Sequence, residues 1–68
     1  MEKVKINTEY IKLEQLLKLA SITQTGGEAK IMIQDGLVKV NGDICKQRGK
    51  KLRVKDKIEV NDKIYVVV

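Results

Sequence analysis

The side chains able to do chemistry in this 68-residue chain are mostly cations. The chain has no His, one Cys and one Ser, so it can form neither a Ser–His nor a Cys–His catalytic pair, and a His/Cys metal site lacks ligands. Its nine acidic residues are scattered along the sequence. We therefore predict that the protein is not an enzyme and holds no metal or other cofactor. Cys45 is interpreted as a small apolar filler rather than a reactive thiol.

The cations are concentrated in the last third of the chain. Residues 46–68 hold eight basic and three acidic residues, whereas residues 1–45 hold six of each, so the last third carries the whole net charge of +5. Its dense part contains Lys46, Arg48, Lys50, Lys51, Arg53, Lys55 and Lys57, with Asp56 as the only acid. An isoelectric point near 9.5 in so small a domain is typical of a protein that binds a polyanion, although a charged run can also be an ordinary solvated surface.

A helix is predicted to begin just after Thr25. Thr25 and Glu28 have the spacing of a capping box, in which each side chain satisfies a backbone N–H of the first turn. Ala29, Met32 and Ile33 follow at the spacing of one helical face. These residues predict a second helix whose apolar face packs on the core.

A hairpin is predicted directly after this helix. Gly36 can adopt the left-handed conformation that ends a helix. From Val38 the apolar period changes to two, with Val40 next on the same face. Asn41-Gly42 is the dipeptide that best supports a tight two-residue hairpin turn, so the chain is expected to reverse there.

A first helix is predicted from an apolar stripe at Leu13, Leu16, Leu17 and Ala20. Its start is poorly marked, because Lys12 occupies the position where a Ser, Thr or Asp cap is usually found. One interpretation is an imperfectly capped helix; a second, functional one follows from the family resemblance described below.

These elements predict a single domain, residues 1–68, of the α+β class, in which two packed helices lie against a small, mainly antiparallel, twisted sheet with tight hairpins. Further strands are expected at residues 3–6, 52–54, 58–60 and 64–68. The N-terminal strand is expected beside the C-terminal one, because both need a partner. Residues 47–51 are expected to form an exposed loop.

Residues 12–42 resemble the signature of the S4-like RNA-binding domain, the αL motif, with the pattern RLDxxLxRxGxxxSRxxARxLxxxGxVxVNG. The matching residues are Lys12-Leu13-Glu14, Thr25 at the Ser, Ala29-Lys30 at the Ala-Arg, and Gly36, Val38, Val40, Asn41 and Gly42 at the end, without a gap. Residues 55–60 resemble the closing GDxIxV of the family. The short length and the wording KLAS…TGGEAK are most similar to the small stand-alone bacterial members of the YbcJ-like group.

The resemblance implies a stand-alone protein that binds structured RNA, such as ribosomal RNA, a ribosomal particle or a tRNA-like fold. It makes Lys12 a cation at an RNA-facing position, and it places Gly26 where the family has an Arg, which removes one contact. The candidate RNA-binding residues are Lys12, Lys30, Gln34, Lys46, Arg48, Lys50, Lys51 and Arg53. The candidate structural turn residues are Gly36, Asn41 and Gly42.

Two other functions fit the same residues. The basic face can serve a protein-interaction adaptor that binds an acidic protein, or the same charges can bind DNA without specificity. The only aromatic residues are Tyr10 and Tyr65, too few for the stacking platform of an RRM or an OB-fold. We therefore expect recognition of phosphates and of folded RNA shape rather than of bases.

The sequence also predicts a location. It contains no signal-like apolar run near Met1 and no apolar span of 18 residues, and its one Cys forms no intramolecular disulfide. These features predict a cytoplasmic protein with neither a membrane nor a small molecule as its partner.

Overall fold

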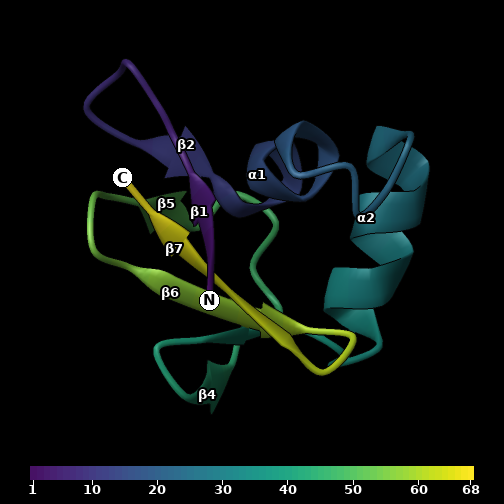
Figure 1. Ribbon diagram of the computed structural model, residues 1–68. Helices are drawn as coiled ribbons and strands as arrows, with labels where there is room; N and C mark the ends of the chain where they lie inside the picture. Colours follow the sequence, from purple (N-terminus) through teal and green to yellow (C-terminus); the bar gives the residue numbers. More distant parts are fainter.

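The computed structural model describes all residues from Met1 to Val68. It contains two helices, α1 (Leu13–Leu19) and α2 (Gly26–Gln34), which pack on each other at one side of the strands (Figure 1). The strands are β1 (Glu2–Val4), β2 (Ile11–Lys12), β3 (Lys39–Val40), β4 (Asp43–Ile44), β5 (Lys51–Leu52), β6 (Lys57–Val60) and β7 (Lys63–Val67). The predicted α+β class, with two helices against a mainly antiparallel sheet, is confirmed.

The main sheet has five strands in the order β1-β7-β6-β3-β4. All neighbours in it are antiparallel except β1 and β7, which run parallel and bring the first and last strands of the chain together (Figure 1). The expected placement of the N-terminal strand beside the C-terminal one is therefore confirmed. This strand is shorter than predicted, since it ends at Val4 instead of Ile6.

A second, two-stranded sheet was not predicted. β2 pairs antiparallel with β5, so that Ile11 faces Leu52 and Lys12 faces Lys51. The exposed loop expected at residues 47–51 therefore ends before Lys51. The strand expected at residues 52–54 is also wrong in extent, because β5 ends at Leu52 and Val54 lies exposed in the following turn.

The core lies between the helices and the main sheet. The predicted helix stripes contribute to it, although Ala20 and Met32 are only partly buried. Cys45 is also half-buried against this core, as expected for an apolar filler. The buried apolar residues are Val4, Leu13, Leu16, Leu17, Ala29, Ile33, Val38, Val40, Leu52, Ile58, Val60, Tyr65 and Val67.

Helix α2 begins and ends where the sequence predicts, but only one of the two expected capping-box bonds forms: the Glu28 carboxylate accepts from the Thr25 hydroxyl at 3.4 Å instead of from the Thr25 N–H. The Thr25 hydroxyl accepts a hydrogen bond from the Glu28 N–H at 3.1 Å, which caps the first turn. At the other end Gly36 has φ +75°, and its N–H donates to the Ile33 carbonyl at 3.1 Å. The next N–H along the chain donates to the Met32 carbonyl, also at 3.1 Å. This pair of bonds is a Schellman motif, which ends the helix and turns the chain into β3.

Two tight turns connect the strands of the main sheet. Asn41 and Gly42 have φ of 50° and 92° between β3 and β4, and Asn61 and Asp62 have φ of 54° and 60° between β6 and β7. Two consecutive positive φ angles are the mark of a type I′ turn, whose twist matches that of the strands. The predicted turn at Asn41-Gly42 is therefore confirmed.

The Gly42→Val substitution is expected to lower the free energy of unfolding by about 1–3 kcal/mol, because a β-branched residue is strained at positive φ. A Cβ at this position meets no atom within 4 Å, so the cost arises from the backbone alone. Gly49→Val is the matched control, since its Cβ is equally free and its φ lies outside the left-handed region. Urea denaturation of both variants measures the difference; equal losses would contradict the turn assignment.

Candidate nucleic-acid interface

The basic loop of residues 47–50 closes the N-terminus of α1. The Leu13 N–H donates to the carbonyl of Lys50 at 2.9 Å, and the Glu14 N–H donates to the carbonyl of Arg48 at 3.1 Å. A helix start leaves backbone N–H groups without partners, and the Lys12 side chain at the N-cap position carries no acceptor for them. The cap is therefore supplied by a distant part of the chain, and it places Arg48 and Lys50 next to the start of α1.

The pairing of β2 with β5 adds two more cations at this point. Lys12 and Lys51 are directly opposite each other across the two strands. Lys51 Nζ also lies 4.8 Å from the centroid of the Tyr10 ring, within the range of a cation–π interaction. We name Lys12, Arg48, Lys50 and Lys51 the loop cluster. Its four cations come from two segments that are far apart in sequence.

The loop cluster has no acidic partner. The one ion pair of the protein joins Lys63 Nζ to Glu2 Oε1 at 3.9 Å, on β7 and β1. Like charges placed directly opposite each other on neighbouring strands repel. A bound polyanion would relieve that repulsion, so the cluster has the electrostatics of a phosphate-binding surface.

Lys46 extends the positive surface toward α2. Its Cε would lie 3.6 Å from a Cβ placed on Gly36, so its stem crosses the end of that helix. A cation is favourable at a helix C-terminus, where carbonyl groups are exposed. Lys46 also lines an open groove along the β3–β4 hairpin together with Gln47 and Lys50. It therefore connects the loop cluster to the C-terminal end of α2.

The remaining candidates are exposed but more separate. Lys30 and Gln34 lie four residues apart on the exposed side of α2, and neither makes a side-chain hydrogen bond or ion pair to the loop cluster. Arg53 lies in the turn after β5, with its side chain exposed. The structure thus brings together five of the eight predicted residues, the loop cluster and Lys46, and leaves Lys30, Gln34 and Arg53 exposed outside that group.

Asp56, the only acid of the basic segment, has a structural role that the sequence did not reveal. Its Oδ2 accepts from the Arg53 N–H at 2.7 Å, and its Oδ1 accepts from Asn41 Nδ2 at 3.1 Å. Asn41 Oδ1 in turn accepts from the Lys57 N–H at 2.9 Å. Asn41 is therefore both a turn residue and a link between the β3–β4 hairpin and the turn that carries Arg53.

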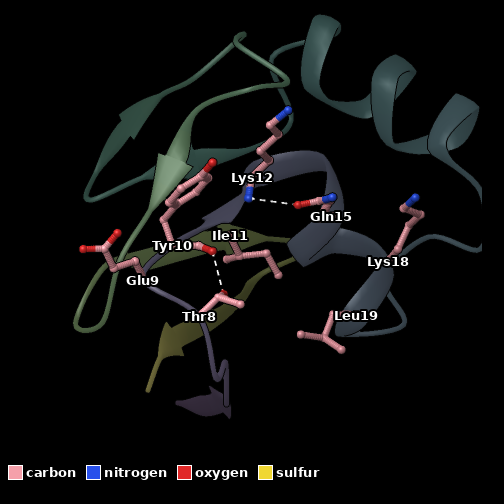
Figure 2. Close-up of a pocket in the computed structure, with 8 residues that line it drawn as sticks. All are labelled: Thr8, Glu9, Tyr10, Ile11, Lys12, Gln15, Lys18 and Leu19. Atoms are coloured by element: carbon pink, nitrogen blue, oxygen red, sulfur yellow. Dashed lines mark hydrogen bonds between the residues drawn. The ribbon is translucent and has the colours of Figure 1, made fainter.

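A groove beside α1 was also missed. It begins at the turn before β2 and runs along the first two turns of α1 (Figure 2). Its lining residues are Thr8, Glu9, Tyr10, Ile11, Lys12, Gln15, Lys18 and Leu19. The one sequence feature that relates to it is Leu19, an apolar residue outside the predicted stripe of α1, which the structure leaves 54% exposed.

Known proteins resemble this chain along most of its length. A family model described as the S4 domain matches residues 4–68. The chain belongs to the S4 domain family. The αL signature of residues 12–42 therefore identified the family correctly.

Two relatives define this similarity further. The chain is 44% identical over 57 residues to a protein of Bacillus subtilis (strain 168) named "Probable ribosome maturation protein RlbA", and the match covers 84% of this chain and 80% of that relative. The fold of this chain is similar to that of the 30S ribosomal protein S4e of Thermoplasma acidophilum, with a TM-score of 0.69, 27% sequence identity and coverage of 91% of this chain. The chain spans a third of S4e, since the match covers 33% of that protein. The predicted similarity to small S4 proteins is confirmed by the first relative.

Neither helix has both the length and the apolar character needed to cross a membrane. The cytoplasmic location expected from the sequence stays a prediction.

The Asp56→Ala substitution is expected to destabilise the protein by about 1–3 kcal/mol, because the Arg53 N–H and the Asn41 amide lose their acceptor. Asp43→Ala removes the same charge from an exposed residue of β4 whose side chain accepts no hydrogen bond, and serves as the control. Thermal melting should separate the two variants. If they melted alike, the link between Asn41 and Asp56 would contribute nothing to stability.

Proposed function

We propose that this protein binds structured RNA of the ribosome, with the loop cluster as the centre of the binding surface. The observation that carries the proposal is the convergence of four cations without ion-pair partners at the start of α1, where the β2–β5 pairing places Lys12 and Lys51, and the first N–H groups of α1 donate to carbonyls of the loop of residues 47–50. Membership of the S4 domain family and the names of the two relatives, a probable ribosome maturation protein and a 30S ribosomal protein, support a ribosomal target.

The proposed mode of binding is recognition of the RNA backbone. Exposed arginine and lysine side chains contact phosphates, which fix the position of the protein without reading the bases. In this proposal Arg53 and Lys46 extend the surface along the RNA, and Lys30 and Gln34 add contacts from α2. Tyr65 is 5% exposed, so no pair of aromatic side chains is available for a stacking platform.

The proposed activity is binding alone, without catalysis or a cofactor. Ribosomal RNA is the inferred target, and a tRNA-like fold is the other RNA that this surface would fit. An adaptor that binds an acidic protein and a nonspecific DNA binder use the same charges, and the two experiments below separate them from the proposed function.

If Arg48, Lys50, Lys51 and Arg53 each neutralise a phosphate, these four contacts should contribute about −2.8 to −3.6 to the slope of log K against log salt, at roughly 0.7–0.9 per contact. Each single Ala substitution should reduce the magnitude of the slope by roughly 0.7–0.9. For Arg48 and Lys50 the stability should change by less than about 0.5 kcal/mol, because their carbonyls, not their side chains, cap α1.

The controls for this measurement are Lys3→Ala and Lys63→Ala, which remove the same charge from β1 and β7. These variants should leave the slope and the affinity nearly unchanged. If these controls lost as much affinity as the Ala variants of Arg48, Lys50, Lys51 and Arg53, the net charge alone would attract the RNA. In that case the proposed surface would be wrong.

A competition experiment separates RNA from DNA. A-form RNA presents 2′-hydroxyl groups and a wide minor groove, so a protein that reads folded RNA shape should bind a structured RNA more tightly than duplex DNA of equal length and charge. Fluorescence anisotropy with the unlabelled competitors measures the two affinities in one buffer. Equal competition would favour the nonspecific DNA binder, and no binding of either would favour the protein adaptor.

A further inference from the structure

The groove beside α1 combines an apolar floor with a polar rim. Ile11 and Leu19 supply apolar surface, and Tyr10 lies at one end. Along the rim, Lys12, Gln15 and Lys18 project from the start and the exposed side of α1, while the Glu9 carboxylate points away from them (Figure 2). The groove is thus open to a ligand with one flat apolar part and one anionic part.

Several polar groups of this groove lack a partner within the protein. Lys12 and Lys18 form no ion pair. Gln15 Oε1 accepts from the Lys12 N–H at 3.4 Å, which orients the amide and leaves its NH₂ group without an acceptor (Figure 2). Two cations and one amide donor are therefore available to phosphate oxygens or to the polar edge of a base.

The Tyr10 ring is half-buried and has one defined contact. Lys51 Nζ lies 4.8 Å from its centroid, while the 2.8 Å bond from the Thr8 hydroxyl to the Tyr10 carbonyl fixes the backbone beside it. Aromatic side chains stack on bases of any sequence, because every base has a flat π-face. Lys12 lines the groove and Lys51 contacts Tyr10, and both belong to the loop cluster. An RNA bound to the loop cluster therefore lies next to the groove.

We propose that this groove receives one unpaired nucleotide of the bound RNA. The base stacks on Tyr10 at one end of the groove, its sugar packs along Ile11 toward Leu19, and the flanking phosphates lie near Lys12 and Lys18. This inference rests on the proposed function and deepens it, because it adds one base contact to a surface that otherwise reads the RNA backbone. It also selects RNA with a loop, bulge or free end beside a helix over uninterrupted duplex.

The test compares two RNAs that share one stem sequence and carry the same number of phosphates. One is a hairpin with unpaired loop nucleotides, and the other is a blunt-ended duplex in which the stem is extended by base pairs until the number of phosphates is equal. The Tyr10→Leu substitution should weaken binding of the hairpin roughly tenfold and of the duplex less than about twofold, since a stacked base is lost only in the hairpin complex. Leu19→Ser, at an exposed position, should also weaken binding of the hairpin more than binding of the duplex, but by a smaller factor than Tyr10→Leu. It should leave the melting temperature nearly unchanged.

The matched control is Ile31→Ser, which removes an apolar side chain that is 60% exposed on α2 and outside the groove. Its affinity for both RNAs should equal that of the unsubstituted protein. Lys50→Ala, in the loop cluster, should weaken the hairpin and the duplex by the same factor. This variant tests the proposed function separately from the groove.

Tyrosine fluorescence gives a second measurement. The chain has two Tyr and no Trp, so Tyr65→Phe leaves Tyr10 as the only tyrosine. The hairpin should quench Tyr10 emission more strongly than the duplex at equal saturation. If Lys50→Ala weakens both RNAs while the groove variants affect neither, or both alike, the groove inference is overturned and the proposed function stands. If Lys50→Ala changes neither affinity, the proposed function itself fails.

Discussion

The two backbone hydrogen bonds that cap α1 are the constraint on which the rest of this structure depends. A helix of seven residues is too short to be stable on its own, because nucleation costs more than so few internal hydrogen bonds return. The carbonyls of Arg48 and Lys50 satisfy the N–H groups of Leu13 and Glu14 and so fix the helix start. The same bonds hold β5 beside β2, which buries Leu52 in the core next to the leucines of α1. Helix, small sheet and basic loop are therefore one unit.

The single acid among the cations illustrates how stability limits the electrostatics of this surface. Asp56 lowers the positive potential around Arg53, which weakens any attraction for a polyanion at that point. It nevertheless accepts hydrogen bonds from both the Arg53 N–H and the Asn41 amide, and hydrogen bonds to a charged group contribute more to stability than neutral ones. Asn41 also accepts from the Lys57 N–H, so the Asp56 carboxylate links the turn that carries Arg53 to the β3–β4 hairpin. The carboxylate therefore weakens the attraction for a polyanion and stabilises two turns at the same time.

The parts of the fold that the sequence predicts well are those with local chemical causes. The Thr25 cap, the left-handed Gly36 and the Asn41-Gly42 turn each depend on neighbours within a few residues, so the sequence predicts α2 and its hairpin with nearly correct bounds. The pairing of Lys12 with Lys51 has no such local signal. β2 and β5 have two residues each, too few to show an apolar alternation in the sequence. The pairing also places two like charges opposite each other, which is electrostatically unfavourable and so is not expected from the sequence. The α1 cap was missed for the same reason, because its acceptors are carbonyls, which every residue carries. The groove could not be predicted without β2, which forms one of its ends.

In the loop of residues 47–50 the backbone and the side chains have different roles. Its carbonyls face α1 and stabilise the fold, whereas its side chains stay exposed and free of ion pairs. This separation lets the side chains of positions 48 and 50 vary in charge without loss of the cap, since the cap needs only the backbone path. The same arrangement couples ligand binding to stability. A ligand that holds the loop in its folded position stabilises the capped α1, and the capped α1 in turn raises the affinity of the loop for that ligand. A 68-residue domain has a small core and little stability in reserve, so even a modest stabilisation of the α1 cap by a bound polyanion is a large fraction of its total stability.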